Sequence, residues 1–258
     1  MLSTFSEATR VKKVVAELKL QEEVVGKIAG SLSPPLQYHS GISHHGFRYA
    51  KPDWRNFCLL KAVRAVSGLN ACVRLFGGGF SQEIAVIIRT IIECTTHIEF
   101  ILSGLKGDQL GSEQAKYIDK FFSDFKRNEV ADFEKPRIRQ GDVHKAVGAR
   151  TDELARSIDR SGSFENVESA TLMSNVYLTY SNYVHCRYPE IMDLFGGVPG
   201  KFHLCGMRDT PKDEENLQQI ETFVVTVSNA LRFLVLNLGM RDEIIQHPAM
   251  SKWYPVPN

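Results

Sequence analysis

Apolar residues recur at helical spacing along most of the chain. In residues 4–30, Val11, Val14 and Leu18 follow one another at steps of three and four, with Lys and Glu between them. This spacing is typical of an amphipathic helix that buries one face. Comparable patterns predict six further helices, over residues 53–76, 84–105, 112–133, part of 142–160, 165–186 and 213–246.

Glycine, proline and capping residues mark the ends of these segments. Asp53 is a candidate N-cap for the second helix, three glycines at 77–79 end that helix, and Ser81 is a candidate cap for the next. Residues 37–53 and the Gly/Pro-rich stretch 196–213 have no apolar periodicity. We therefore predict that both stretches are loops.

The order of these segments predicts the fold class. About seven helices, without alternating strand patterns between them, favour an all-α fold, most commonly an antiparallel bundle with peripheral helices. No repeat or linker divides the chain. We expect one helical domain over residues 1–258, in which 1–35 form a helix packed on the bundle, 53–246 form the core and 247–258 form an extended tail.

Composition and charge limit the classes of binding partner and the cellular location of the protein. The net charge of +1 excludes a wholesale polyanion-binding character, although a local basic patch such as 135–150 can still contact phosphates. Five scattered cysteines favour a reduced, cytoplasmic location. The N-terminus lacks the features of a secretory signal, and the apolar segment 223–240 carries too many polar residues for a membrane span.

Charged residues interrupt the apolar pattern of the third helix. Arg89, Glu93 and His97 follow one another at steps of four, which places them along one face of the helix. A buried charged pair is costly unless it is hydrogen-bonded, so we expect partners from another helix.

Residues 169–186 contain no Asp, Glu, Lys or Arg. Hydroxyl and imidazole groups recur there at steps of three and four, and form one stripe of Ser174, Tyr177, Ser181, His185 and Tyr188. Such groups can satisfy a buried charge without adding a second unpaired charge. We therefore expect the stripe to face Arg89 and Glu93.

Four interpretations of these polar residues stay open at the sequence level. They are a rigid network that fixes helix register, or a polar site for a small ligand. Alternatively, Arg89, Glu93 and His97 are a solvent-facing stripe without a special role, or the 169–186 helix is a homodimer surface. As candidate catalytic residues we take His185, Arg89 and Glu93, and as candidate pocket residues Tyr177, Ser181, Tyr188 and His97.

Known metal and cofactor motifs do not match. Glu93 and His97 lack the Glu-x-x-His spacing of di-iron bundles, and His39, His44 and His45 lie in a predicted loop without firm ligand spacing. The glycines at 77–79 lack the Lys of a phosphate-binding loop. We predict no dedicated metal site and no cofactor, and keep metal-dependent chemistry as the weakest alternative.

The run LKAVRAVSGLNACVRLFGGGFSQEIAVIIRTIIE at 60–93, together with YSNYVH at 180–185, resembles a pattern of uncharacterised bacterial all-helical proteins. These proteins pair an Arg-x-x-x-Glu helix with a later helix that ends near a His. They are loosely grouped with abortive-infection proteins and the HEPN superfamily of helical defence ribonucleases. The resemblance implies an all-helical fold and an RNA-cleaving toxin or anti-phage defence activity.

The HEPN signature is an Arg, then four to six intervening residues, then a His, in which Arg steadies a phosphate and His moves a proton. Two pairs match it, Arg139 with His144 and Arg241 with His247, and the second also has a polar residue after the Arg. His185 has no Arg at the required distance. Two functions follow: a binding or regulatory module, expected to be a homodimer, or a HEPN-like nuclease acting on RNA.

Overall fold

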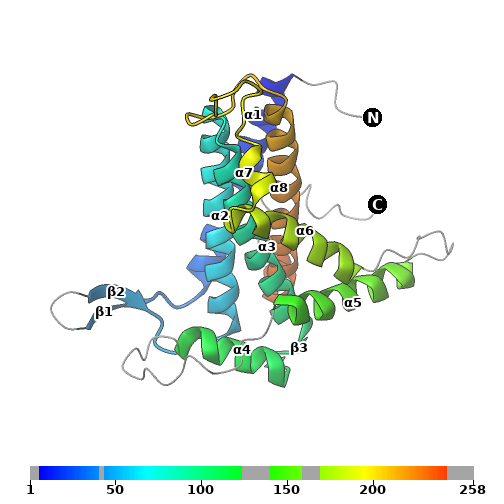
Figure 1. The fold of residues 1–258 in the computed structure, drawn as a ribbon. Coiled ribbons are helices and arrows are strands. Elements are labelled where there is room, and N and C mark those ends of the chain that lie inside the picture. The colour runs from blue at the N-terminus through cyan, green and yellow to red at the C-terminus, as the bar shows by residue number, and fades with distance from the viewer. Residues whose placement is uncertain (1–5, 41–43, 124–139, 159–168, 243–258) are drawn as a thin grey trace.

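A computed structural model of the protein describes residues 6–40, 44–123, 140–158 and 169–242 (Figure 1). Within these residues the chain forms eight helices and two small two-stranded sheets. The predicted all-α fold is confirmed.

Four long helices form the body of the molecule and run alongside one another in Figure 1. They are α1 (Glu7–Ser31), α2 (Trp54–Gly78), α3 (Ser81–Ser103) and α8 (Lys212–Asn237). One apolar core runs through them, and Leu69, Ile91 and Leu231 are fully buried within it. Helix α3 is central, since it packs against α2, α8, α5 and α6.

The predicted long helices at 4–30, 53–76 and 84–105 are confirmed to within a few residues. The helix predicted over 213–246 begins as expected, but its predicted end is wrong: α8 ends at Asn237, and Gly239 follows with a left-handed φ of 69°.

The predicted N-cap of α2 is confirmed. The Asp53 carboxylate accepts hydrogen bonds from the backbone N–H groups of Arg55 and Asn56, and the Asn56 side chain accepts one from the Asp53 N–H at 3.1 Å. This reciprocal capping box satisfies N–H groups that the first turn of a helix leaves unpaired.

The turn between α2 and α3 depends on glycine. Gly79 has a left-handed φ of 71°, and a Cβ there would lie 2.4 Å from the backbone nitrogen of Arg208. The Met207 N–H donates to the Gly79 carbonyl at 2.8 Å, so the turn is tied directly to the 196–213 connector. The expected cap at Ser81 is wrong: Phe80 is the N-cap residue, and the Ser81 hydroxyl instead accepts from the Asn216 amide at 2.7 Å.

The prediction that residues 37–53 form a loop is also wrong for the first part of that range, which forms two strands. Strands β1 (Leu36–Ser40) and β2 (His44–Arg48) form an antiparallel hairpin that projects from the body (Figure 1). Leu36 and Phe47, its large apolar residues, are both exposed. These exposed positions show no alternating apolar pattern that would predict a strand. A second short pair, β3 (Leu105–Lys106) and β4 (Gln109–Leu110), follows α3.

Four smaller helices lie at the periphery: α4 (Ser112–Ser123), α5 (Gln140–Ile158), α6 (Ser169–Val184) and α7 (Tyr188–Met192). Helices α5 and α6 pack closely on each other, and a Cβ at Gly148 would lie 2.4 Å from the backbone nitrogen of Ala170. Residues 124–139 and 159–168, where the predicted helices extended further, lie outside the described residues.

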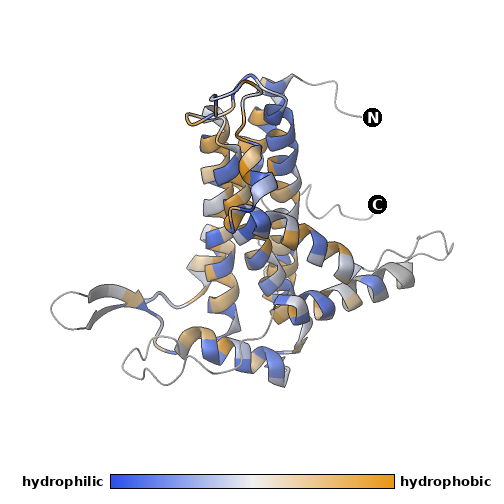
Figure 2. Ribbon diagram, in the orientation of Figure 1, coloured by the Kyte–Doolittle hydropathy of each residue, from blue (hydrophilic) through white to orange (hydrophobic). Residues whose placement is uncertain are grey.

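Apolar and polar residues alternate around the long helices (Figure 2). By length and composition α8 could cross a membrane, but half of its apolar window is buried inside the fold. A core helix of a soluble protein meets the same criterion, and α8 packs on α1, α2 and α3.

Candidate functional site

An ion pair lies on the face of α3 that meets α6. The Arg89 guanidinium contacts the Glu93 carboxylate at 2.7 Å, and the two side chains are 17% and 33% exposed. Because Arg precedes Glu by four residues, the less favourable order within a helix, the pair gains from partners on a second helix.

Helix α6 supplies these partners. Arg89 donates from Nε to the Ser181 hydroxyl at 2.9 Å and from a terminal nitrogen to the Tyr177 hydroxyl. The guanidinium also lies 3.8 Å from the centroid of the Tyr177 ring, and the Tyr177 hydroxyl donates to Glu93 at 3.4 Å. The structure thus brings Tyr177 and Ser181 to the charged pair, as predicted. We call Arg89, Glu93, Tyr177 and Ser181 the polar cluster.

A chain of hydrogen bonds continues from α3 to α4, α5 and α6. His97 contacts the Tyr117 hydroxyl at 2.9 Å and Gln140 Oε1 at 3.1 Å. Gln140 Nε2 lies 3.0 Å from His144 Nε2, and His144 Nδ1 lies 3.3 Å from the Ser174 hydroxyl. We call these five residues the histidine chain.

The two histidines of this chain are buried and neutral. Burial, with a smaller effect from the charge of Lys61, lowers the pKa of His97 to about 4. Burial and the nearby charge of Arg89 also lower the pKa of His144. A neutral imidazole has one donor and one acceptor, so His97 can donate to Gln140 while His144 accepts from Gln140 and donates to Ser174.

The histidine chain touches the polar cluster through an aromatic contact. The rings of His144 and Tyr177 meet edge to face, with their centroids 5.1 Å apart. Sequence reasoning placed His97 near the site but treated His144 only as part of a signature match. The sequence feature that could have identified His144 as an interior residue is its position in an amphipathic helix, beside Val143 and Val147, which are buried.

His185 and Tyr188 do not take the predicted position in the interior. His185 follows the end of α6 and is exposed, and Tyr188 begins α7 and is 78% exposed. Cys186 has a φ of 48°, which turns the chain between the two helices and interrupts the stripe. The His185 N–H still donates to the Ser181 carbonyl at 3.0 Å, so His185 lies one helical turn beyond Ser181.

The two Arg/His signature matches fall in different surroundings. His144 is buried and hydrogen-bonded within the histidine chain, whereas Arg139 lies outside the described residues. Arg241 is exposed, and His247 lies outside the described residues.

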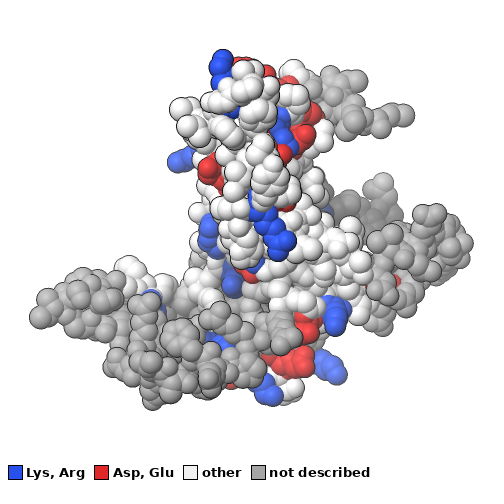
Figure 3. Space-filling view, in the orientation of Figure 1, with Lys and Arg blue, Asp and Glu red and all other residues white. Residues whose placement is uncertain are grey.

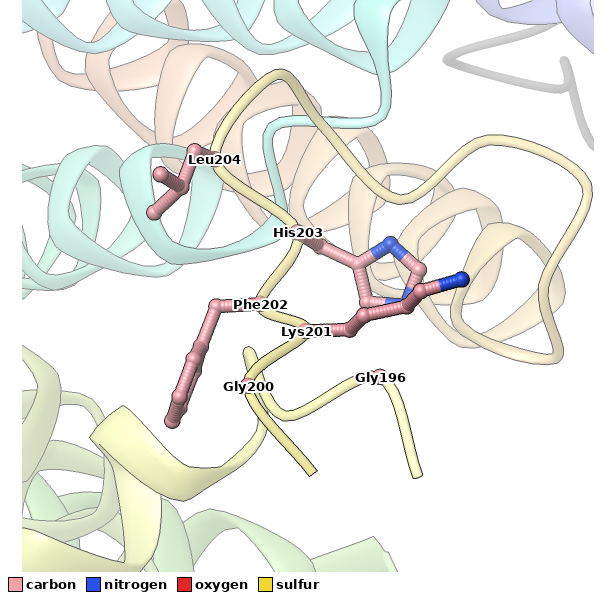
Figure 4. A pocket seen from close by; sticks show the side chains of 6 residues that line it. All are labelled: Gly196, Gly200, Lys201, Phe202, His203 and Leu204. Carbon is pink, nitrogen blue, oxygen red and sulfur yellow. The ribbon is translucent and has the colours of Figure 1, made fainter. Parts of the chain in front are cut away.

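A separate hollow of about 460 Å³ lies on the connector and is lined by residues between Gly196 and Leu204 (Figure 4). It shares no residue with the polar cluster. Within the described ranges, no three His, Cys, Asp or Glu side chains gather as metal ligands would.

Comparison with known proteins identified no relative of this chain. No protein-family model, no curated protein and no solved structure matches the chain.

Proposed function

We propose that this protein is a helical binding module that holds a small ligand carrying a phosphate beside a hydroxyl, such as a ribonucleotide, at the polar cluster. One observation carries the proposal. Arg89 and Glu93 keep 17% and 33% of their side chains exposed at the seam between α3 and α6, with the exposed His185 one turn away. This exposure leaves both charged side chains within reach of a ligand from solvent.

The hydrogen-bonding capacity of the pair suits such a ligand. Arg89 has five N–H donors, of which three are directed to Ser181, Tyr177 and Glu93. One N–H on each terminal nitrogen is left for a ligand oxygen, and guanidinium groups bind phosphate through such paired donors. Glu93 can accept a hydrogen bond from a neighbouring hydroxyl, because each carboxylate oxygen has two lone pairs.

Cleavage of RNA is the second candidate function, and the position of His185 favours it. His185 lies on the same side of α6 as Ser181, which contacts Arg89. An exposed imidazole there can take the proton of a ribose 2′-hydroxyl while Arg89 steadies the phosphate. The resemblance to HEPN-like defence proteins points to the same chemistry. A cytoplasmic setting belongs to both proposals, and all five cysteines are free.

Titration calorimetry with ribonucleotides and with inorganic phosphate tests the binding function. We expect Arg89→Lys to weaken binding by about tenfold or more, because lysine cannot form the paired contacts of a guanidinium. Arg74→Lys, an exposed arginine on α2, is the matched control and should bind like the wild type. Equal binding by Arg89→Lys and wild type, at equal melting temperatures, would overturn the proposal, as would no binding of any ligand in the panel.

Incubation with a labelled RNA separates cleavage from binding. If the second function holds, His185→Ala abolishes cleavage and retains nucleotide binding, since His185 contributes the proton transfer and not the phosphate contact. His247→Ala is the parallel variant for the Arg241 signature. If the wild type and both variants leave the RNA intact, the nuclease hypothesis is excluded and only the binding function remains as a proposal.

A further inference from the structure

Among the residues that the structure describes, two basic side chains on α2 have no acidic partner. Arg64 is exposed, and within the same residues it forms no hydrogen bond and no ion pair. Lys61 is half-buried, and its Nζ lies 5.3 Å from the centroid of the Phe57 ring and 5.0 Å from that of Phe121. Aromatic rings attract an ammonium group but do not neutralise its charge. In the described part of the chain, both side chains therefore keep a positive charge that no carboxylate offsets.

Both side chains lie on the side of α2 that faces α3. Lys61, Arg64 and Gly68 follow one another at steps of three and four, which places them along one face of the helix. A Cβ at Gly68 would lie 3.1 Å from Ile91 and 3.2 Å from Ile87 of α3, so this face meets α3 directly. Because Arg64 is exposed, it lies at the rim of this contact.

The packing register places Arg64 beside the polar cluster. Cys72 Sγ lies 4.0 Å from the carbonyl oxygen of Ile84. Gly68, one turn earlier on α2, meets Ile91, which lies later on α3, so the two helices are antiparallel. One turn earlier still on α2, Arg64 lies level with the part of α3 that follows Ile91. This part of α3 contains the acidic residue of the polar cluster.

The charges around Cys94, which follows Glu93 on α3, agree with this placement. Burial raises the pKa of the Cys94 thiol, the positive charges of Lys61 and Arg64 lower it, and the charge of Glu93 raises it. Glu93 is already paired with Arg89 at 2.7 Å. The two cations of α2 therefore leave an excess of positive charge on this side of α3.

We propose that Lys61 and Arg64 bind a second phosphate of the ligand whose first phosphate is bound by Arg89. This inference rests on the proposed function and narrows the ligand to a ribonucleotide with two or more phosphates. The pair of Arg89 and Glu93 has no net charge, so the two cations of α2 supply the attraction for an anion that the pair lacks. Figure 3 shows Lys and Arg side chains along the side of the body that α2 occupies in Figure 1.

Titration calorimetry of the full chain with three adenosine ligands tests the inference. Adenosine monophosphate has one phosphate, adenosine diphosphate has two adjacent phosphates, and the 5′-phosphorylated dinucleotide pApA has two phosphates separated by a ribose. We expect at least one of the two-phosphate ligands to bind about tenfold more tightly than the monophosphate, the usual gain from one charge-assisted contact. The ligand that gains shows whether the second phosphate belongs to a nucleoside diphosphate or to an RNA strand.

Variants of α2 connect this gain to the two cations. Arg64→Gln and Lys61→Gln should reduce the affinity ratio between the two-phosphate ligand and the monophosphate from about ten toward one. Arg64→Lys keeps the charge and should retain most of the ratio. Arg74→Gln, at an exposed arginine further along α2, is the matched control and should keep the wild-type ratio.

The outcomes separate this inference from the proposed function. If the monophosphate binds and neither two-phosphate ligand binds more tightly, the inference is overturned while the proposed function stands. Equal ratios in Arg64→Gln and Arg74→Gln proteins of equal melting temperature overturn it as well. If none of the three ligands binds, the proposed function fails and this inference fails with it.

Discussion

At the scale of single residues, the partners of Arg89 follow a simple physical rule. A half-buried guanidinium needs acceptors, and neutral hydroxyl groups supply them without a second unpaired charge. The sequence was sufficient to predict that Tyr177 and Ser181 would meet Arg89 and Glu93, because helical spacing puts each set on one face. The contacts of Ser181 at 2.9 Å and Tyr177 confirm this pairing.

His185 and His144 show where this reasoning fails. Spacing alone extended the α6 stripe to His185, but a turn at Cys186, with a φ of 48°, ends the helix before the side chain can pack. His144 enters the interior because α5 lies across α3 and α6. The position of one helix against another depends on packing between distant segments, which the pattern along a single segment does not encode.

The histidine chain predicts how stability changes with pH. An unfolded histidine has a pKa of about 6.5, and burial lowers the pKa of His97 to about 4. Between these values the unfolded chain binds a proton that the folded chain does not, so the His97 contribution to stability falls as pH drops from about 6.5 to 4. His97→Gln removes this contribution. From pH 7 to pH 4, the free energy of unfolding should fall by about 3 kcal/mol less in the variant than in the wild type.

Urea unfolding at a series of pH values measures this difference. Burial raises the pKa of Glu99 to about 7, so the contribution of Glu99 to stability increases as pH falls through part of this range. Because Glu99 is present in both proteins, this contribution cancels in the comparison. Parallel curves for wild type and His97→Gln would contradict the assignment of a neutral, buried His97.

At the scale of elements, α6 shows how packing settles an ambiguous segment. Its Val, Tyr and Thr content is compatible with a strand, and the spacing of its hydroxyl groups predicted a helix. The segment Ser169–Val184 is helical, with Met173, Val176 and Tyr180 against the core. The β1–β2 hairpin could not be predicted in the same way, since its sequence lacks an alternating apolar pattern and Leu36 and Phe47 are exposed.

The crossing of α5 and α6 depends on Gly148. A methyl group there would lie 2.4 Å from the Ala170 backbone, so α6 would have to move away from α5. We expect Gly148→Ala to lower the free energy of unfolding by about 1–3 kcal/mol, the usual cost of overpacking. Thermal and urea unfolding measure this change.

Gly141→Ala is the matched control on the same helix. A Cβ at Gly141 meets nothing within 4 Å, so alanine should leave stability unchanged or raise it by a few tenths of a kcal/mol. Equal stability of the Gly141→Ala and Gly148→Ala proteins would show that the helix crossing tolerates a wider separation.

At the scale of the whole molecule, amphipathic periodicity was enough to predict the bundle. The long helices α1, α2, α3 and α8 each bury the apolar face that their sequences indicate. The contacts that join the two ends of the chain were not predictable. Arg10 on α1 binds Glu214 and Glu221 on α8, both at 2.7 Å, across more than 200 residues of sequence. Such pairs depend on which helices become neighbours.

One seam of this bundle carries the proposed function. The seam between α3 and α6 exposes the polar cluster. Helix α6 positions it, because Tyr177 and Ser181 on its inner side hold Arg89.

The central claim is that Arg89 binds the ligand. The most direct measurement follows the Arg89 Nε–H resonance by NMR during a titration with a ribonucleotide, with the Arg89→Lys spectrum as the assignment control. We expect a saturable shift of this resonance, together with a shift of the His185 ring signals. A titration that moves only the signals of Lys201 and His203 at the connector hollow, or that leaves the Arg89 resonance in place, would contradict the proposed site.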